Sequence, residues 1–303
     1  MNKNKIIALI SAILATLFWG IHPIISQKLI AEQIDTLNIA AVRLFGAALF
    51  LFIFSKIFAP KNSEKKIIRK PIFFIGALFG FGLNFILFQK ALEYSPAGIV
   101  TIYEAFTPFF VVLLGILFFR KDFSNVLQKK KLFLLLIITF LTSTGVALLF
   151  FDFNTKQNSS WFGNTLAFLS AVCFALYFIA NSRVRKQNPE TDSFVMTYNF
   201  LFFAGIIILP FVDWGNFMEM TLKHWLMLSF IVIFGTSLTY FLWTFAAKYL
   251  NVTLQSLLFN LTMIFTVIFD NFFGKLLITW QIVVSIFIVA ISAFLVDKLL
   301  KEK

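Results

Sequence analysis

The sequence predicts an all-α integral membrane protein with ten transmembrane helices, arranged as two inverted repeats of five. Three observations predict this fold class: an apolar composition, ten apolar runs, and an internal duplication. Of the 303 residues, 60% are hydrophobic and 13% are charged, which leaves too little polar surface to cover a soluble globule. The runs approach the ~20 residues that cross a bilayer as a helix, and they lack the alternation of barrel strands.

Short polar breaks separate the first five apolar runs. They place spans at residues 6–27, 37–57, 71–89, 96–119 and 132–151. Lys3 and Lys5 precede the first run as they would in a signal peptide, but Trp19, His22 and Pro23 occupy the place of a small-residue cleavage site. The first run is therefore expected to remain as a span.

The second five runs place spans at residues 162–182, 194–211, 224–246, 252–273 and 279–297. The single cysteine, Cys173, falls inside the sixth span, where it is expected to be a small buried hydrophobic residue. Four tryptophans lie at span ends, where they are typical of interfacial anchors: Trp161, Trp214, Trp225 and Trp280.

The chain contains an internal duplication. Residues 79–120 align without a gap with residues 234–275, and the identical pairs are Phe79/Phe234, Gly80/Gly235, Leu83/Leu238, Leu87/Leu242, Ala91/Ala246, Tyr94/Tyr249, Thr107/Thr262, Phe110/Phe265, Val112/Val267 and Phe118/Phe273. Near the start, at an offset of 159, Ser11 matches Ser170. Each half has five spans, an odd number, so the second half is expected to be inverted relative to the first. Most membrane chains built in this way are transporters, with the substrate site at the repeat interface.

The distribution of basic residues predicts the orientation. With ten spans both termini lie on one side, and 20 of the 26 lysines and arginines fall on that side. Five fall on the other side, and Arg43 lies inside the second span. This bias predicts that both termini are cytoplasmic. It also accounts for the net charge of +12 through topology and anionic lipid, so no nucleic-acid partner is expected.

Four motifs resemble the EamA-type branch of the drug/metabolite transporter (DMT) superfamily. They are Trp19-Gly20, Ala41-Val42-Arg43-Leu44-Phe45, Ala91-Leu92-x-Tyr94-x-Pro96-Ala97-Gly98 and Thr107-Pro108-Phe109-Phe110. The resemblance covers the whole chain and implies two EamA repeats, at residues 1–152 and 153–303, with cytoplasmic termini. The second repeat carries Met263 where the family usually has proline, so the kink expected at Pro108 is not expected in the ninth span.

Ionisable groups at depth in the membrane are the main candidates for function, because a charge in hydrocarbon normally faces a cavity or a partner. At ~1.5 Å per residue, His22, Arg43 and Glu104 all lie about 8 to 12 Å below the outer surface. Asp270 is shallower and is expected to reach the outer headgroups.

Two interpretations of these groups remain open. Glu104 could be a protonatable coupling group or a substrate ligand, with Arg43 as its switchable partner and His22 nearby. Alternatively, Arg43 and Glu104 could form a fixed ion pair that orders the second and fourth spans, and His22 could be a hydrogen-bonded residue at a helix end.

Polar and aromatic residues on the facing helices complete the predicted substrate pocket. Thr101, Glu104 and Pro108 share one helical face, and a kink at Pro108 would free a carbonyl toward the cavity. The other candidates are Trp19, Asn84, Tyr103, Thr107, Asn181, Tyr240, Trp243 and Asn260. Such a pocket suits a small organic metabolite, although polar residues of this kind also form hydrogen bonds between membrane helices.

Other functional classes are disfavoured. The two histidines lie far apart, and no metal-ligand cluster, nucleotide loop or nucleophile motif is present, so we expect neither an enzyme, a metal nor a cofactor. A single buried acid does not make a channel filter. The sequence therefore predicts a secondary transporter, a monomer or homodimer in the bacterial inner membrane. It would move amino acids or related metabolites, with protons as a possible coupling partner. The alternatives are an exporter of cationic drugs and a membrane scaffold.

Overall fold

The computed structural model describes residues 3–59, 70–118, 129–150, 160–274 and 280–301. The described chain is almost wholly helical and contains no β-strand. The helices of the first half are α1 (Lys3–Ala31), α2 (Thr36–Phe58), α3 (Pro71–Phe74), η1 (Ile75–Gly82), α4 (Leu83–Tyr94), α5 (Ala97–Glu104), α6 (Thr107–Phe118) and α8 (Lys129–Phe150).

The second half has the same order of passes. Its helices are α9 (Trp161–Gln187), α10 (Ser193–Ile206), η2 (Leu209–Phe211), η3 (Asn216–Glu219), α11 (Leu222–Val232), η4 (Ile233–Leu238), α12 (Thr239–Ala246), α13 (Val252–Phe259), α14 (Leu261–Gly274) and α15 (Trp280–Lys301). Within the described ranges, nine passes are long and apolar enough to span a bilayer. The seventh, α10, has 14 residues and is shorter than the predicted span at 194–211.

Each half carries a π-helical segment in its third pass. η1 covers Ile75–Gly82 and η4 covers Ile233–Leu238, which are overlapping positions under the 155-residue offset of the duplication. In η4 the hydroxyl groups of Thr236 and Ser237 donate to the carbonyls five residues earlier, at 3.0 and 2.7 Å. These extra bonds support the wider turn, because π-helical segments otherwise have poorer geometry than the α-helix.

Both halves also break their fourth pass at equivalent positions. The first break, at residues 105–106, lies between α5 and α6, just before Pro108, where a kink was predicted. The second lies at Asn260, between α13 and α14. The expectation that the ninth span would lack a kink, because Met263 replaces proline, is therefore wrong. Ala105 and Asn260 are 155 residues apart, so the break follows the repeat and does not require proline.

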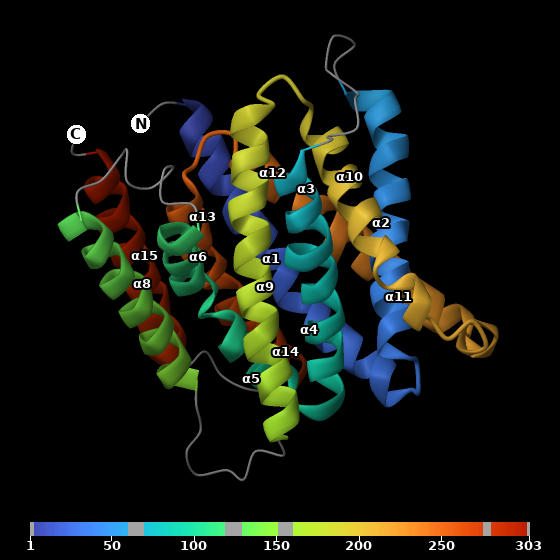
Figure 1. Ribbon diagram of the computed structural model, residues 1–303. Coiled ribbons are helices and arrows are strands. Elements are labelled where there is room, and N and C mark those ends of the chain that lie inside the picture. Colours follow the sequence, from blue (N-terminus) through green and yellow to red (C-terminus); the bar gives the residue numbers. More distant parts are fainter. Residues whose placement is uncertain (1–2, 60–69, 119–128, 151–159, 275–279, 302–303) are drawn as a thin grey trace.

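The two halves run in opposite directions through the bundle. In Figure 1, α1 begins at the end of the bundle where both termini lie, whereas its counterpart α9 begins at the opposite end. The start of α1 and the end of α15 thus lie on one side, and the repeats are inverted as predicted. The assignment of that side to the cytoplasm still rests on the lysine and arginine bias.

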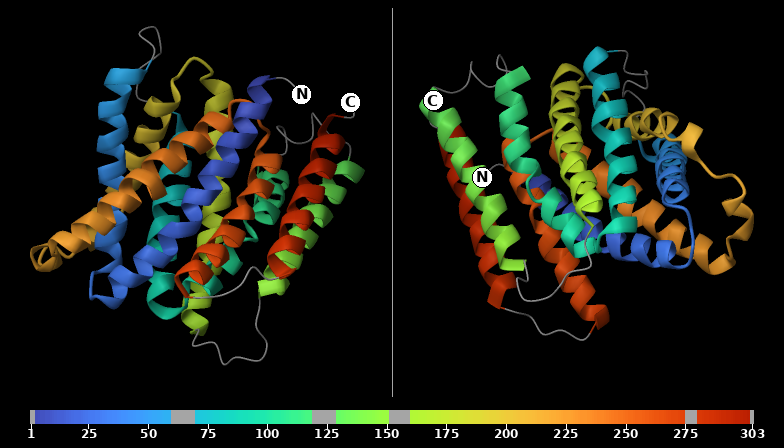
Figure 2. Two further views of the ribbon diagram at one scale, coloured as in Figure 1. Left: turned by 180° about the vertical axis from the view of Figure 1, so that it is seen from behind. Right: turned by 60° about the horizontal axis from the view of Figure 1, so that its bottom comes forward.

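Helices of the two halves pack against each other reciprocally. α1 packs against α12 and α14 of the second half, and α9 packs against η1, α4, α5 and α6 of the first. The equivalent helices α2 and α10 pack on one flank, and α8 and α15 on the other, as the views in Figure 2 also show. Because α1 and α9 each pack on the opposite repeat, the centre of the bundle lies between the two repeats.

Glycine permits the closest of these approaches. A Cβ atom on Gly80 would lie 2.6 Å from the backbone nitrogen of Tyr177 in α9, which is closer than real Cβ contacts. The Gly76-x-x-x-Gly80 spacing therefore serves packing between η1 and α9.

Candidate functional site

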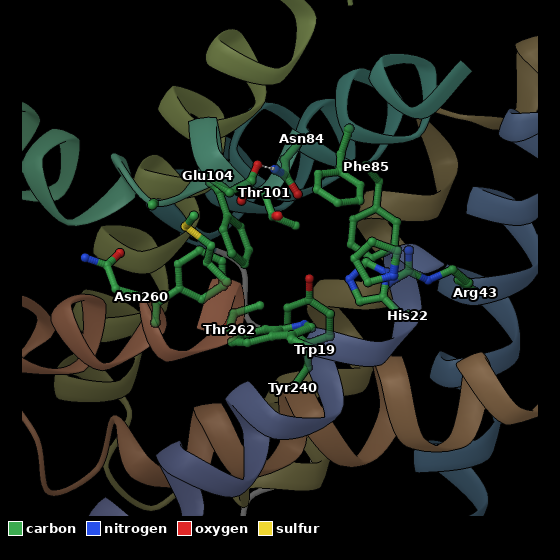
Figure 3. Close-up of a pocket in the computed structure, with 16 residues that line it drawn as sticks. Trp19, His22, Arg43, Asn84, Phe85, Thr101, Glu104, Tyr240, Asn260 and Thr262 are labelled. Atoms are coloured by element: carbon green, nitrogen blue, oxygen red, sulfur yellow. Dashed lines mark hydrogen bonds between the residues drawn. The ribbon is translucent and has the colours of Figure 1, made fainter. Parts of the chain in front are cut away.

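A pocket that is open on one side lies where the two repeats meet, and the empty space in and around its mouth is about 510 Å³. Residues from both repeats form its wall, as Figure 3 shows. Eight of the pocket candidates singled out in the sequence line it: Trp19, His22, Arg43, Asn84, Thr101, Glu104, Tyr240 and Asn260.

Glu104 forms one end of the pocket. It is the last residue of α5 and its side chain is buried, with 5% exposed. Asn84 Nδ2 donates to Glu104 Oε1 at 3.3 Å, and Ser170 Oγ donates to the same oxygen. Asn84 Nδ2 also lies 3.0 Å from the backbone oxygen of Ser170. Neutral donors from two neighbouring helices therefore hold this carboxyl group.

The break after Glu104 explains its position. Pro108 has no backbone N–H, so the helix cannot make the usual bond from that residue to the Glu104 carbonyl. α5 stops at Glu104 and α6 starts at Thr107. The acid is thus placed at the end of a half-helix at the centre of the bundle.

Arg43 lies on the other side of the pocket, on α2 (Figure 3). Its Nε donates to Thr236 Oγ1 at 3.2 Å, and its guanidinium carbon lies 4.6 Å from the centre of the Phe85 ring. Thr236 can accept this bond because its own hydroxyl hydrogen points to the Ile231 carbonyl at 3.0 Å. A hydroxyl of the π-helical turn and an aromatic face therefore hold the cation.

Arg43 and Glu104 form no ion pair with each other, and neither has an oppositely charged partner within 4 Å among the described residues. The fixed ion pair considered from the sequence is thus not formed in this structure. Each group is held by neutral polar or aromatic contacts instead, so a guanidinium group and a carboxyl group face one cavity without pairing. A buried, uncompensated charge is costly, so this arrangement favours a charged ligand.

His22 lies on the same side of the pocket as Arg43 (Figure 3). It lies within α1, nine residues before the end of the helix at Ala31. Its Nδ1 atom is buried and has no hydrogen-bond partner in the described part of the chain. His22 is therefore not at a helix end, as one interpretation of the sequence placed it. Its ring lies 5.5 Å from that of Phe88.

Aromatic rings form much of the remaining wall. Trp19 packs edge-on against Tyr240 at 5.0 Å and against Phe259 at 5.3 Å between ring centres. Phe174 lies 5.7 Å from Trp19 and 5.1 Å from Phe259. These contacts join α1, α9, α12 and α13 into one apolar surface between the two charged ends.

Four predicted residues do not line the pocket. Tyr103 is half-buried beside the apolar clusters around α5, and Thr107 is buried at the start of α6. Asn181 accepts a bond of 3.5 Å from Thr244 Oγ1. Trp243 packs behind Trp19, with 4.9 Å between ring centres. The side chain of Asp270 lies outside the described residues.

The sequence did not single out several residues of the site. Phe85, Phe88 and Phe174 form pocket walls, and Ser170 binds Glu104. The chain has 44 phenylalanines, so no local signal distinguishes these three from lipid-facing ones. In the sequence, Ser170 was noted only because it matches Ser11 in the internal duplication. No group of three His, Cys, Asp or Glu residues in the described part of the chain could hold a metal ion.

Comparison with known proteins gives consistent matches. The sequence profile of the EamA-like transporter family matches residues 6–151 and 161–296. An uncharacterized transporter, YxxF, of Bacillus subtilis (strain 168) is 23% identical over 274 residues, covering 90% of this chain and 83% of that protein. A protein of Escherichia coli (strain K12) described as a biotin transporter is 21% identical over 241 residues, covering 78% and 74%. A solved crystal structure aligns over 96% of this chain and 98% of its own, with a TM-score of 0.68 and 13% identity, which shows a shared fold.

Proposed function

The chain belongs to the EamA-like transporter family, and we propose that it carries amino acids or related small metabolites across the bacterial inner membrane by alternating access. The family and the similar proteins support a membrane transporter. The observation that carries the substrate class is the placement of Arg43 and Glu104 on opposite sides of one pocket, with no ion pair between them.

The architecture supports alternating access. In inverted-repeat carriers, the substrate site lies at the repeat interface, and rocking of the two parts opens it to each side in turn. Here the pocket takes residues from both repeats, and α1 and α9 each pack on the other repeat. Broken fourth passes on both sides of the pseudo-two-fold axis place polar backbone beside the pocket.

The chemistry of the pocket suits a zwitterion. A guanidinium group binds a carboxylate through two parallel hydrogen bonds, and only Nε of Arg43 has a hydrogen-bond acceptor among the described residues. At the other end, both donors to Glu104 end on Oε1, so Oε2 is free to accept from an ammonium group. The aromatic wall between the two ends would hold an apolar body.

Glu104 would also couple transport to protons. A carboxyl group held only by neutral donors can lose or gain its proton without breaking an ion pair. In this form of the proposal, protonation of Glu104 replaces the substrate's ammonium group during the return of the empty carrier. A proton-independent exchanger would contradict this form but not the zwitterion site.

Two other ligand classes use only one end of the pocket. A cationic compound would need Glu104 and the aromatic rings, as in the alternative of a drug exporter. A monocarboxylate such as biotin, named in the description of two of the relatives, would need Arg43. A membrane scaffold would need neither charge.

A thermal-shift screen of the purified protein separates these classes. The panel contains neutral amino acids, biotin and a hydrophobic cation such as tetraphenylphosphonium, each tested on wild type, Glu104→Gln and Arg43→Gln. A ligand at ~100 times its Kd should add about 2.7 kcal/mol of stability. The proposal predicts that amino acids stabilise the wild type and that both variants lose this effect.

The other outcomes point elsewhere. A cation whose effect is lost only in Glu104→Gln would support the exporter of cationic compounds. Biotin, with an effect lost only in Arg43→Gln, would support a carboxylate carrier. Equal responses in all three proteins would exclude this pocket as the site.

A further inference from the structure

Glu104, Asn84 and Ser170 form a closed hydrogen-bonded group on three helices. Glu104 belongs to α5 and Asn84 to α4, both in the first repeat, whereas Ser170 belongs to α9 in the second. Asn84 Nδ2 contacts both Glu104 Oε1 and the Ser170 carbonyl oxygen, and Ser170 Oγ contacts the same Oε1. All three side chains are at least 95% buried.

The two oxygens of the carboxyl group are therefore not equivalent. Both donors end on Oε1, and the pocket lies beside the same carboxyl group (Figure 3). In a protonated carboxyl group, one oxygen is a carbonyl that still accepts hydrogen bonds, and the other carries the proton. Donors fixed on Oε1 favour the form in which Oε2 carries the proton.

We propose that Ser170 is the positioning residue of Glu104: with Asn84 it keeps Oε1 as the acceptor in both protonation states, so that Oε2 is the atom that exchanges the proton. This inference rests on the proposed proton coupling of the same site and names the residue that organises it. Since the Ser170–Glu104 bond joins the two repeats, the carboxyl group is also sensitive to the position of α9.

The duplication supplies a matched control for this role. Ser11 in α1 is the repeat equivalent of Ser170, and it is also buried. The residue equivalent to Glu104 is Phe259 and that equivalent to Asn84 is Thr239, so Ser11 has no acid in the corresponding position. If serine serves only helix packing at these sites, Ser11→Ala and Ser170→Ala should behave alike.

Ser170 has a competing acceptor. Its Oγ lies 3.0 Å from the carbonyl oxygen of Ala167, one turn earlier in α9, and serine hydroxyls often bond in this way within helices. A bond to a carboxylate is stronger than a bond to a neutral carbonyl, which favours Glu104 as the acceptor of the ionised form. When Glu104 is protonated, its carbonyl oxygen and the Ala167 carbonyl oxygen compete most evenly for the Ser170 hydroxyl group. The protonated form of Glu104 is therefore the state to test.

Infrared difference spectroscopy between acidic and alkaline buffer measures this state directly. The carbonyl band of protonated Glu104 is the band that disappears in Glu104→Gln. Hydrogen bonds to the carbonyl oxygen lower the frequency of such a band. We expect Ser170→Ala to shift the band to higher frequency, Ser170→Thr to restore it toward the wild-type position, and Ser11→Ala to leave it unchanged.

Three results would overturn the inference: a band that does not move in Ser170→Ala, an equal shift in Ser11→Ala, or no band that depends on Glu104. Monodisperse elution and thermal midpoints within a few degrees of wild type establish that the variants are folded. The measurement requires no substrate, so the inference can hold while the ligand screen fails. A failure of the infrared test alone would leave the zwitterion site standing.

Discussion

Thr236 accepts a hydrogen bond of 3.2 Å from Arg43 Nε, and this contact joins α2 of the first repeat to the π-helical segment of the second. The hydroxyl of Thr236 bonds to the carbonyl five residues earlier, so the wider turn orients an oxygen toward the guanidinium group. The buried arginine of the second span is therefore held by a local irregularity of the opposite repeat.

Replacement of Thr236 by valine should destabilise the protein. The substitution keeps the shape of the side chain but leaves a buried Nε without its acceptor, a loss of about 1–3 kcal/mol. Thr236→Ser retains the hydroxyl group and should remain close to wild type. Thermal unfolding in detergent measures both, and equal stability of the valine and serine variants would show that the bond contributes nothing.

Gly80→Ala should disrupt the packing of α9 on η1. The added Cβ would lie 2.6 Å from the backbone nitrogen of Tyr177 and 2.9 Å from its Cα, and backbone cannot move aside as a flexible side chain can. We expect a loss of at least ~1–3 kcal/mol and a lower yield of folded protein. Gly98→Ala is the control, because a Cβ there meets nothing within 4 Å; a neutral Gly80→Ala would contradict the observed approach.

Asn260→Leu should stabilise the protein in the absence of ligand. Asn260 is fully buried at the break between α13 and α14, and both its amide atoms lack a hydrogen-bond partner in the described part of the chain. An unsatisfied buried polar group costs about 1–3 kcal/mol, and leucine removes that cost. Because Asn260 lines the pocket, the stabilisation by amino acids should fall at the same time. A lower thermal midpoint for Asn260→Leu would show that the amide makes a stabilising bond.

Glu32 links the two repeats at the end of the bundle opposite the termini, and its contribution should depend on pH. Lys223 Nζ lies 2.6 Å from Oε1 and His224 Nε2 lies 2.9 Å from Oε2. The hydrogen bonds from Lys223 and then from His224 lower the pKa of Glu32 below its ordinary value. A lowered pKa in the folded state means that the stabilisation is complete above the pKa of the unfolded chain, about 4.3, and is lost as the pH falls through the folded pKa.

The thermal midpoint of Glu32→Gln should therefore be lower than that of wild type at pH 7, and the two should converge below about pH 4. Glu190→Gln, at an exposed acid that also lies outside the spans, is the control and should show no such gap. A difference between Glu32→Gln and wild type that is constant from pH 7 to pH 3 would contradict the ionic origin of the contact.

Much of the fold could be predicted because bilayer thickness and the internal duplication constrain the sequence strongly. The ten passes, the inverted repeats and the break near Pro108 all follow from run length, duplication and proline chemistry. The break at Asn260 could not be predicted from its neighbours, because Met263 is compatible with a helix. The only sequence feature that indicated the break at Asn260 was its equivalence with Ala105 in the duplication. The two π-helical segments likewise share only their equivalent positions in the repeats.

The sequence singled out the ionisable residues that line the pocket, but not their arrangement around it. An ionisable residue in a membrane helix is rare enough to be singled out, which identified Arg43, Glu104 and His22. The separation of Arg43 from Glu104 across the pocket depends on how α2 and α5 pack, and no local pattern encodes that distance. Ser170 and Phe85, which hold the acid and the cation, are ordinary residues in sequence and gain their roles only through tertiary contacts.

The most direct test of the account is counterflow in proteoliposomes, with the amino acid that stabilises the protein most. A carrier that alternates access around the Arg43–Glu104 pocket should concentrate the labelled compound against an excess of unlabelled compound inside. Wild-type uptake should depend on pH, and Glu104→Gln should lose most of that uptake. No counterflow by folded wild-type protein, or uptake by Glu104→Gln at the wild-type rate with unchanged pH dependence, would contradict it.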